Sequence, residues 1–162
     1  MSTRSGIGYD SHRFAEGRPL VLGGVEIEDA ERGLEGHSDA DVLTHAVMDA
    51  LLGAAGLADI GEHFPDSDER YRDANSLELL DVVRGMVVER DLIVTSVDAT
   101  VLCESPRLAP YRDRMRENLA LALGIEGARV NVKFGTNEGM GWIGRGEGAA
   151  AMAVATLDHL GR

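Results

Sequence analysis

The sequence predicts an α/β sandwich built from one domain that spans residues 1–162. Segments with strand periodicity alternate along the chain with longer segments of helical periodicity, which is typical of strands separated by helices. No linker rich in serine, glycine or proline, no low-complexity run and no internal repeat divides the chain. Its 162 residues match the length of one ordinary domain.

The first element is expected to be a strand that carries chemistry on one face. Residues alternate in character over 7–12, so Asp10 and His12, which are two positions apart, share a face of the strand. Residues 19–28 follow and predict a hairpin around two consecutive glycines.

The next element is expected to be a largely apolar helix. Apolar residues recur at helical spacing over residues 42–54, and Gly56 stands where the helix would end. Ser38 is a favourable N-cap for this helix. Residues 61–75 are polar and rich in turn-forming residues, which predicts a surface loop.

The rest of the chain alternates helices and strands. The expected elements are a helix over 75–90, a strand over 94–102, an amphipathic helix over 111–123, a strand over 128–134 and an alanine-rich segment over 148–160. Intrinsic propensity alone predicts a helix for the alanine-rich segment.

Composition and charge exclude several classes of protein. Apolar residues make up 44% of the chain and charged residues 27%, the balance of a soluble globular protein rather than a disordered one. The net charge of −12 argues against nucleic-acid binding, which depends on basic patches. An anionic small-molecule substrate stays compatible with this charge, because a metal ion or a few arginines can make one pocket positive.

The sequence predicts a cytoplasmic protein without a membrane attachment. The longest weakly charged apolar runs, residues 50–58 and 149–157, are about half of the ~20 residues that a membrane span needs. No apolar core of a signal peptide follows the first residues. Cys103 is the single cysteine, so an internal disulfide is impossible and a reducing compartment is expected.

Asp10, His12 and His45 are candidate metal ligands. Together they offer two nitrogens and one oxygen, a set that suits zinc with its fourth position open. Asp41 and Asp49 lie four residues before and after His45, so either could accept the other ring N–H of His45. The alternative is that Asp-x-His occurs by chance and that the helical histidine is a boundary residue bonded to a carboxylate.

Two later segments are candidate phosphate sites. Six glycines within residues 135–148 allow backbone amides to approach an anion; Thr136 adds a hydroxyl donor and Glu138 a ligand for a hard cation. Residues 103–110 predict a rigid, proline-flanked loop in which Arg107 is suited to pair with phosphate. The alternatives are a mobile glycine-rich turn and an ordinary strand-to-helix connection.

Four segments taken together resemble one family, the 2-C-methyl-D-erythritol 2,4-cyclodiphosphate synthases of the non-mevalonate isoprenoid pathway. These segments are residues 6–12, 36–42, 57–66 and 144–148. The resemblance covers essentially the whole chain. It implies a lyase that converts 4-diphosphocytidyl-2-C-methyl-D-erythritol 2-phosphate into the cyclic diphosphate and CMP. It also implies a mixed sheet with helices on one face, a C-terminal strand, and a homotrimer with active sites at its subunit interfaces.

The resemblance implies a role for each matching residue. Zinc, or another divalent transition metal, is expected at Asp10, His12 and His45, and Mg²⁺ or Mn²⁺ on the substrate diphosphate near Glu138. His37 and Thr136 are the expected catalytic residues, orienting the transferring phosphates. The expected substrate-binding residues are Asp10, His12, His37, Ser38, Asp59, Ile60, Gly61, Phe64, Asp66, Asp68, Cys103, Arg107, Ala109, Gly135, Thr136, Asn137, Glu138, Trp142 and Arg145.

The implied chemistry is a metal-assisted phosphoryl transfer within one substrate molecule, for which positioning matters more than covalent catalysis. An isoprenoid diphosphate near Arg145 in a central cavity is a further implied partner. Two alternatives remain: a zinc-dependent phosphohydrolase that uses water as nucleophile, and a non-catalytic trimer that binds isoprenoid diphosphates. The chain departs from the family pattern at Gly135-Thr136-Asn137, Arg107 and Trp142, and at none of the expected metal ligands.

Overall fold

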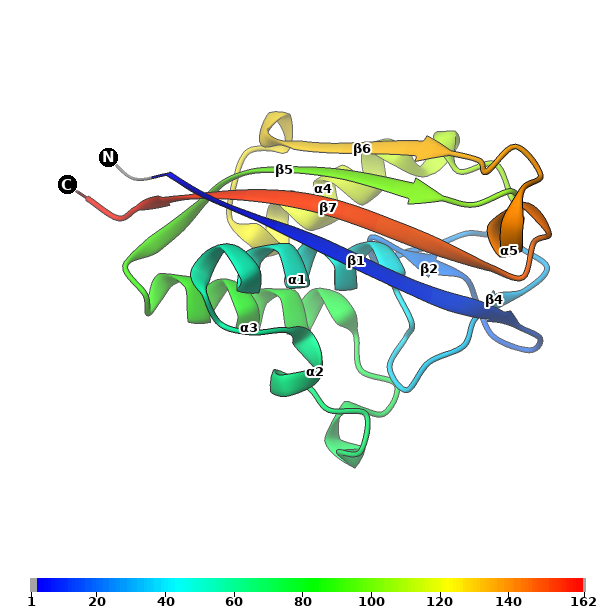
Figure 1. Cartoon of the computed structure of the whole chain (residues 1–162), viewed down its shortest axis with the longest axis horizontal. Coiled ribbons are helices and arrows are strands. Elements are labelled where there is room, and N and C mark those ends of the chain that lie inside the picture. The colour runs from blue at the N-terminus through cyan, green and yellow to red at the C-terminus, as the bar shows by residue number, and fades with distance from the viewer. Residues whose placement is uncertain (1–2, 162) are drawn as a thin grey trace.

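A five-stranded mixed sheet with helices on one face forms the fold (Figure 1). This computed structural model describes residues 3–161. The strand order is β4-β1-β7-β5-β6; β5 and β6 run parallel, and the other neighbours are antiparallel. The strands are β1 (Arg4–Ala15), β4 (Gly33–Leu34), β5 (Leu92–Leu102), β6 (Val130–Gly135) and β7 (Gly148–His159).

Three longer helices cover the buried face of the sheet: α1 (Val42–Ala55), α3 (Ser76–Val88) and α4 (Arg112–Leu123). A small hairpin of β2 (Val21–Leu22) and β3 (Val25–Glu26) lies beside the start of α1. The remaining elements are short: α2 (Ile60–His63), α5 (Gly141–Gly144), and three 3-10 turns, η1 (Glu69–Tyr71), η2 (Ala109–Tyr111) and η3 (Gly127–Arg129).

The predicted mixed α/β fold is confirmed, and most predicted elements form within a few residues of their expected bounds. The C-terminal segment is a strand, as the resemblance implies, and not the helix that propensity predicts. Pairing with β1 on one side and β5 on the other overrides the weak helical preference of alanine. The predicted surface loop 61–75 contains two short helical turns, the end of α2 and η1.

Two glycines of β1 let α1 pack directly against the sheet. A Cβ at Gly8 would lie 1.9 Å from the carbonyl oxygen of Ala46, and one at Gly6 would lie 2.1 Å from that of Ala50. Any other residue at these positions would push the helix away, because such contacts lie far inside van der Waals distance. The two glycines thereby fix the distance between β1 and α1, the elements that carry Asp10 and His45.

Asp41, and not the predicted Ser38, is the N-cap of α1. The Asp41 carboxylate is fully buried and accepts four hydrogen bonds, from the Thr44 amide and hydroxyl and from the backbone amides of Gly23 and Gly24. Burial raises the pKa of Asp41, and these donors oppose that effect. Ser38 is displaced from the cap because this carboxylate also fastens the hairpin to the helix. Gly56 ends the helix in the left-handed conformation, as predicted.

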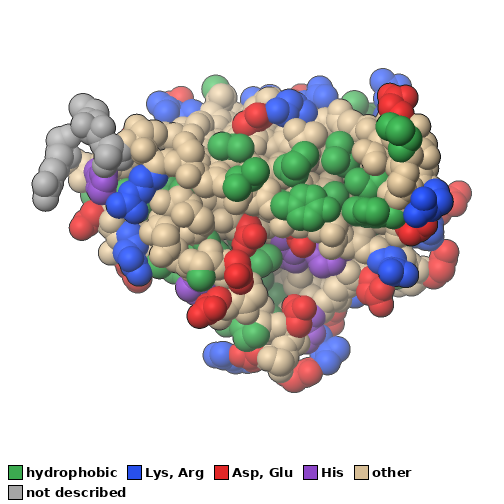
Figure 2. Space-filling view, in the orientation of Figure 1, with side chains coloured by type: hydrophobic (Ala, Val, Ile, Leu, Met, Phe, Trp, Pro, Cys, Tyr) green, Lys and Arg blue, Asp and Glu red, His purple; other side chains and the backbone are tan. Residues whose placement is uncertain are grey.

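The other face of the sheet is open and partly apolar. Ile7 is 73% exposed and Val154 45%, and Tyr9 and Met152 on the same strands are also exposed. Hydrophobic side chains gather over β1 and β7 on the face shown in Figure 2. Within residues 3–161, no helix has the length and apolar character needed to cross a membrane.

Replacing Gly8 with alanine tests the role of the close helix–strand contact. We expect Gly8→Ala to lower the free energy of unfolding by about 1–3 kcal/mol, because its methyl group overlaps the Ala46 carbonyl. Urea unfolding at a fixed protein concentration measures this change. Gly127→Ala is the matched control, since a Cβ there meets no atom within 4 Å. Equal stabilities of the two variants would contradict the packing argument.

Candidate metal and substrate site

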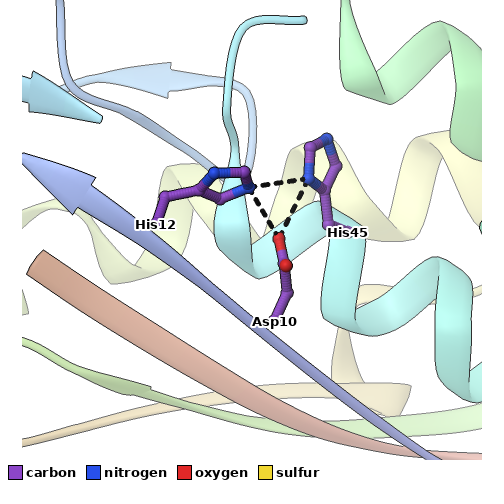
Figure 3. A group of neighbouring side chains, drawn as sticks. All are labelled: Asp10, His12 and His45. Atoms are coloured by element: carbon purple, nitrogen blue, oxygen red, sulfur yellow. Dashed lines mark hydrogen bonds and ion pairs between the residues drawn. The ribbon is translucent and has the colours of Figure 1, made fainter. Parts of the chain in front are cut away.

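Asp10 and His12 from β1 meet His45 from α1 at one end of the sheet (Figure 3). Oδ2 of Asp10 lies 2.9 Å from Nε2 of His12 and 3.0 Å from Nδ1 of His45. The two ring nitrogens are 3.4 Å apart. The structure therefore brings together the three residues that the sequence singled out as metal ligands.

A backbone carbonyl sets the protonation of the His12 ring. Nδ1 of His12 lies 2.7 Å from the carbonyl oxygen of Glu35. A carbonyl oxygen can only accept, so Nδ1 carries a hydrogen and donates it. In the neutral ring Nε2 then has a free lone pair, and Nε2 is the atom beside Asp10.

Ser76 and Asp39, which we call the relay, set which nitrogen of the His45 ring carries a hydrogen. Nε2 of His45 lies 2.9 Å from the hydroxyl oxygen of Ser76, and this hydroxyl donates to the carboxylate of Asp39. Because the carboxylate only accepts, the Ser76 oxygen is left to accept from Nε2–H. Nδ1 of His45 therefore keeps its lone pair, and it faces Asp10.

The relay corrects the predicted partner of His45. Asp41 does not accept the ring N–H, since its carboxylate caps α1 and binds the hairpin amides. Asp49 does not accept it either: its carboxylate accepts from the backbone amide of Ile60 at 3.0 Å. The spacing within one helix predicted a partner on that helix, whereas the actual partner stands at the start of α3.

Electrostatics favour a cation between the three side chains. Burial alone raises the pKa of Asp10, but hydrogen bonds from His12 and His45 outweigh it and lower the value to about 2. Burial lowers the pKa of His12, and the Asp10 carboxylate reverses that effect and raises it. The ionised Asp10 carboxylate would in the same way favour a divalent cation bound between the three side chains.

The geometry fits a zinc-sized ion. Ligand atoms about 2.0–2.1 Å from a tetrahedral centre lie about 3.3 Å from one another. The three observed separations, 2.9, 3.0 and 3.4 Å, are close to this value. Lone pairs on two nitrogens and one ionised oxygen point to the same place, and a fourth position is open to the adjacent cavity.

That cavity has a volume of about 470 Å³ and opens beside the three side chains. His37 lies in its wall, and Nε2 of His37 is 3.0 Å from the carbonyl oxygen of Asp68. Asp59 caps α2, which places two further wall residues. The residues of the expected substrate site that line the cavity are Asp10, His12, His37, Ser38, Ile60, Gly61, Phe64 and Asp66.

Most of the remaining expected site residues lie on the far side of the sheet from Asp10. Asp59 and Asp68 do not line the cavity but stay beside it, at the caps of α2 and η1. Asp10, Ala151, Val101 and Phe134 form one row across the four strands from β1 to β6. Three strand spacings separate its ends by about 14 Å. The residues that follow the ends of β5 and β6 are Cys103, Arg107, Ala109, Gly135, Thr136, Asn137 and Glu138. Trp142 and Arg145 lie beside the start of β7: the Trp142 carbonyl accepts from the Glu147 amide, and the Glu147 carbonyl accepts from Phe14 of β1.

Within this second group, Glu104 holds the loop that follows β6. Its carboxylate accepts from the Asn137 amide at 2.5 Å, while Thr136 and Glu138 on either side are exposed. Cys103 is buried, which raises the pKa of its thiol, and the thiol donates to the Ser105 carbonyl. The structure gives Cys103 no features of a nucleophile.

Sequence reasoning missed the residues that orient the ligands. Ser76 and Asp39 are separated by 37 positions, and neither belongs to a motif with the histidine that they orient. The local signal was the predicted start of a helix at residue 75. Asn75 is the N-cap of α3, and its side chain accepts from the Leu77 amide, which fixes the first turn in which Ser76 lies.

Comparisons with known proteins agree with this arrangement. The model of the YgbB family matches residues 3–158. The chain is 60% identical over 159 residues to the 2-C-methyl-D-erythritol 2,4-cyclodiphosphate synthase of Rubrobacter xylanophilus, covering 96% of this chain and 95% of the relative. The bifunctional IspDF of Campylobacter jejuni superposes with a TM-score of 0.94 at 43% identity, covering 98% of this chain and 43% of that longer one. A CDP complex of IspF from Plasmodium falciparum gives a TM-score of 0.86 at 30% identity, covering 99% of this chain and 98% of that one.

Removing the Ser76 hydroxyl tests the relay. We expect Ser76→Ala to weaken zinc binding by roughly 10–100-fold, because His45 loses the acceptor that fixes its tautomer. Competition against a chromogenic chelator measures the affinity, and Ser67→Ala in the exposed loop is the control. Zinc affinity equal to that of the unaltered protein would show that Ser76 does not orient His45.

Proposed function

The chain belongs to the family of 2-C-methyl-D-erythritol 2,4-cyclodiphosphate synthases, and on that premise we propose that Asp10, His12 and His45 hold zinc in the substrate cavity. The family reaction converts 4-diphosphocytidyl-2-C-methyl-D-erythritol 2-phosphate into 2-C-methyl-D-erythritol 2,4-cyclodiphosphate and CMP. The observation that carries the zinc assignment is the convergence of two histidine lone pairs and one ionised carboxylate oxygen beside a cavity.

The main task of the protein in this reaction is to align the reacting phosphate groups. An oxygen of the 2-phosphate attacks the β-phosphorus of the diphosphate, and the bond from that phosphorus to the CMP oxygen breaks, so CMP leaves with the electron pair. The ring closes only when the attacking oxygen, the phosphorus and the leaving oxygen lie nearly in line. A bound divalent ion supplies positive charge against the phosphate oxygens.

His37 and Ser38 are the residues that we assign to phosphate orientation at the metal end of the cavity. Nε2–H of His37 donates to the carbonyl of Asp68, which holds the ring against the cavity wall. The Ser38 hydroxyl lies 3.3 Å from Nε2 of His45, close to the metal ligands. The methylerythritol portion of the substrate is assigned to the segment around the cavity wall that Ile60, Gly61, Phe64, Pro65 and Asp66 form, with Asp59 and Asp68 beside it.

We assign the cytidine and the second metal ion to the group at the β6 edge. Thr136 offers a hydroxyl to the diphosphate and Glu138 a carboxylate to Mg²⁺ or Mn²⁺. The loop from Cys103 to Ala109 is assigned to the cytidine. The CDP complex of the Plasmodium falciparum relative supports a nucleotide ligand.

A homotrimer of this single-domain chain would join the two groups. Within one chain they stand three strands apart, too far for one phosphate chain bound at Asp10 to reach Glu138 across the sheet. The open sheet face offers exposed apolar side chains on β1 and β7 for contact with other copies. A cyclic arrangement places the β6 edge of one subunit beside the cavity of the next, and Arg145 beside a central cavity suited to an isoprenoid diphosphate.

Product analysis tests the function and the zinc ligands together. Incubation of the zinc-loaded protein with its substrate and Mg²⁺, followed by phosphorus NMR, is expected to show CMP and a cyclic diphosphate. His45→Ala is expected to lose bound zinc and about 10³-fold of the turnover, since several kcal/mol of charge stabilisation disappear. His159→Ala, an exposed residue on β7, is the control.

Two results would overturn these assignments. A linear phosphate product would indicate hydrolysis by water instead of cyclisation. Full zinc occupancy in His45→Ala, measured by elemental analysis, would remove His45 from the ligand set.

A charge on the open sheet face tests the assembly. We expect Val154→Asp to convert trimers into monomers or unfolded chains, because it buries a carboxylate in an apolar interface. Sedimentation velocity measures the assembly state. Leu121→Asp on the outer side of α4, where the leucine is 84% exposed, should leave the trimer intact. A trimeric Val154→Asp variant would exclude this face as the interface.

A further inference from the structure

We propose that Arg18 is a positioning residue that holds the main chain around His37 and Ser38 in its active conformation. Arg18 lies in the connection between β1 and β2, outside the lining of the cavity. One terminal guanidinium nitrogen donates to the carbonyl of Gly36 at 2.7 Å, and the other donates to the carbonyl of Ser38 at 2.7 Å. The two bonds therefore grip the backbone immediately before and after His37.

The opposite edge of the same segment is held by other backbone groups. The carbonyl of His37 accepts from the amide of Asp73 at 2.9 Å, and the amide of Asp39 donates to the carbonyl of Ala74 at 3.2 Å. Successive carbonyls of this segment thus bind partners on alternate sides, as they do in a strand. Arg18 lies on the side where, in a sheet, a neighbouring strand would donate hydrogen bonds to the carbonyls of Gly36 and Ser38.

All hydrogen bonds of the Arg18 guanidinium within the described part of the chain go to these two carbonyls, and no carboxylate there forms an ion pair with it. The planar guanidinium carries donors in a fixed fork, so it bridges two acceptors at a set spacing. A lysine ammonium is a single donor centre on a flexible chain and does not reproduce that spacing.

The two hydrogen bonds of Arg18 matter because residues 36–38 lie directly beside the proposed site. The carbonyl of Glu35, next to Gly36, receives the hydrogen bond from His12. The Ser38 hydroxyl lies 3.3 Å from Nε2 of His45. Releasing the carbonyls on one edge would let His37 and Ser38 shift relative to the metal ligands, and in-line phosphoryl transfer is sensitive to displacements of about 1 Å.

Kinetics of Arg18 variants test the proposal, which for this readout rests on the proposed function. We expect Arg18→Ala to lower kcat/KM by about 100-fold, as for a comparable misplacement, while zinc affinity stays within about threefold because the three ligands keep their own partners. Arg18→Lys should recover only part of this loss, and it serves as the test variant if Arg18→Ala does not fold.

Arg116 provides a matched control. It also donates to two backbone carbonyls, those of Val130 at 2.9 Å and Gly127 at 3.1 Å, but it joins α4 to η3 and β6. Unlike Arg18 it also forms an ion pair, with exposed Asp113 at 3.4 Å, and such a surface pair contributes little. Arg116→Ala removes the same kind of interaction far from the cavity, so its kcat/KM should stay within about twofold of the unaltered enzyme. Equal kinetic losses in Arg18→Ala and Arg116→Ala would reduce Arg18 to a general structural role and overturn the proposal.

Chemical rescue separates positioning from folding. Low-millimolar guanidinium chloride should raise the activity of Arg18→Ala by about tenfold, because the small cation can occupy the space left by the Arg18 side chain and donate to the same carbonyls. It should leave the activity of Arg116→Ala unchanged, and sodium chloride at the same concentration is the salt control. A failure of rescue combined with loss of zinc would show that the variant has lost the ligand frame, against the proposal.

Hydrogen exchange tests whether Arg18 holds the backbone of residues 36–38, and this test needs no enzyme activity. In Arg18→Ala the amides of Asp39 and Asp73, which pair on the other edge of the segment, should exchange faster, whereas Arg116→Ala should leave them unchanged. Unchanged protection in Arg18→Ala would exclude the grip. An unaltered protein that forms no cyclic product would refute the proposed function, and the exchange result would still decide the role of Arg18.

Discussion

The close contact between β1 and α1 determines where the chemistry of this chain can occur. Gly6 and Gly8 leave no side chain between the strand and the helix, so the Ala46 and Ala50 carbonyls approach the strand backbone directly. Asp10 follows on the same face of the strand, and His45 precedes Ala46 on the helix. The ligand triad is thus a consequence of backbone packing. Asp41 completes the frame by fastening the β2–β3 hairpin to the start of the helix.

The ligands depend on partners that lie far away in the sequence. A carbonyl of the chain after β4 orients His12, and the Ser76–Asp39 pair orients His45. Both histidines consequently present a lone pair next to one carboxylate, in a chain whose net charge is −12. A divalent cation bound there would neutralise this carboxylate and would give an acidic protein a local site for polyanionic phosphates.

Much of the fold and the ligand set could be predicted from the sequence, because the signals are local or belong to a recognisable pattern. Asp10 and His12 share a strand face through simple alternation, and Gly56 ends α1 where the sequence predicts the helix end. The prediction that Ser38 is the N-cap of α1 was wrong, because the hairpin amides that favour Asp41 over Ser38 lie outside the helix. The predicted partner of His45 was wrong for a similar reason: the actual partner, Ser76, is 31 residues away in the sequence, at the start of another helix.

The central claim of the proposed trimer is that the two halves of the site come from different subunits. Co-expression of His45→Ala and Glu138→Ala chains with different tags, followed by purification of mixed trimers, tests this claim directly. If each site takes His45 from one subunit and Glu138 from its neighbour, every mixed trimer keeps one intact site in three, so about a third of the activity should return. Mixed trimers as inactive as the two parent variants would show that both halves come from one chain, and would contradict the account.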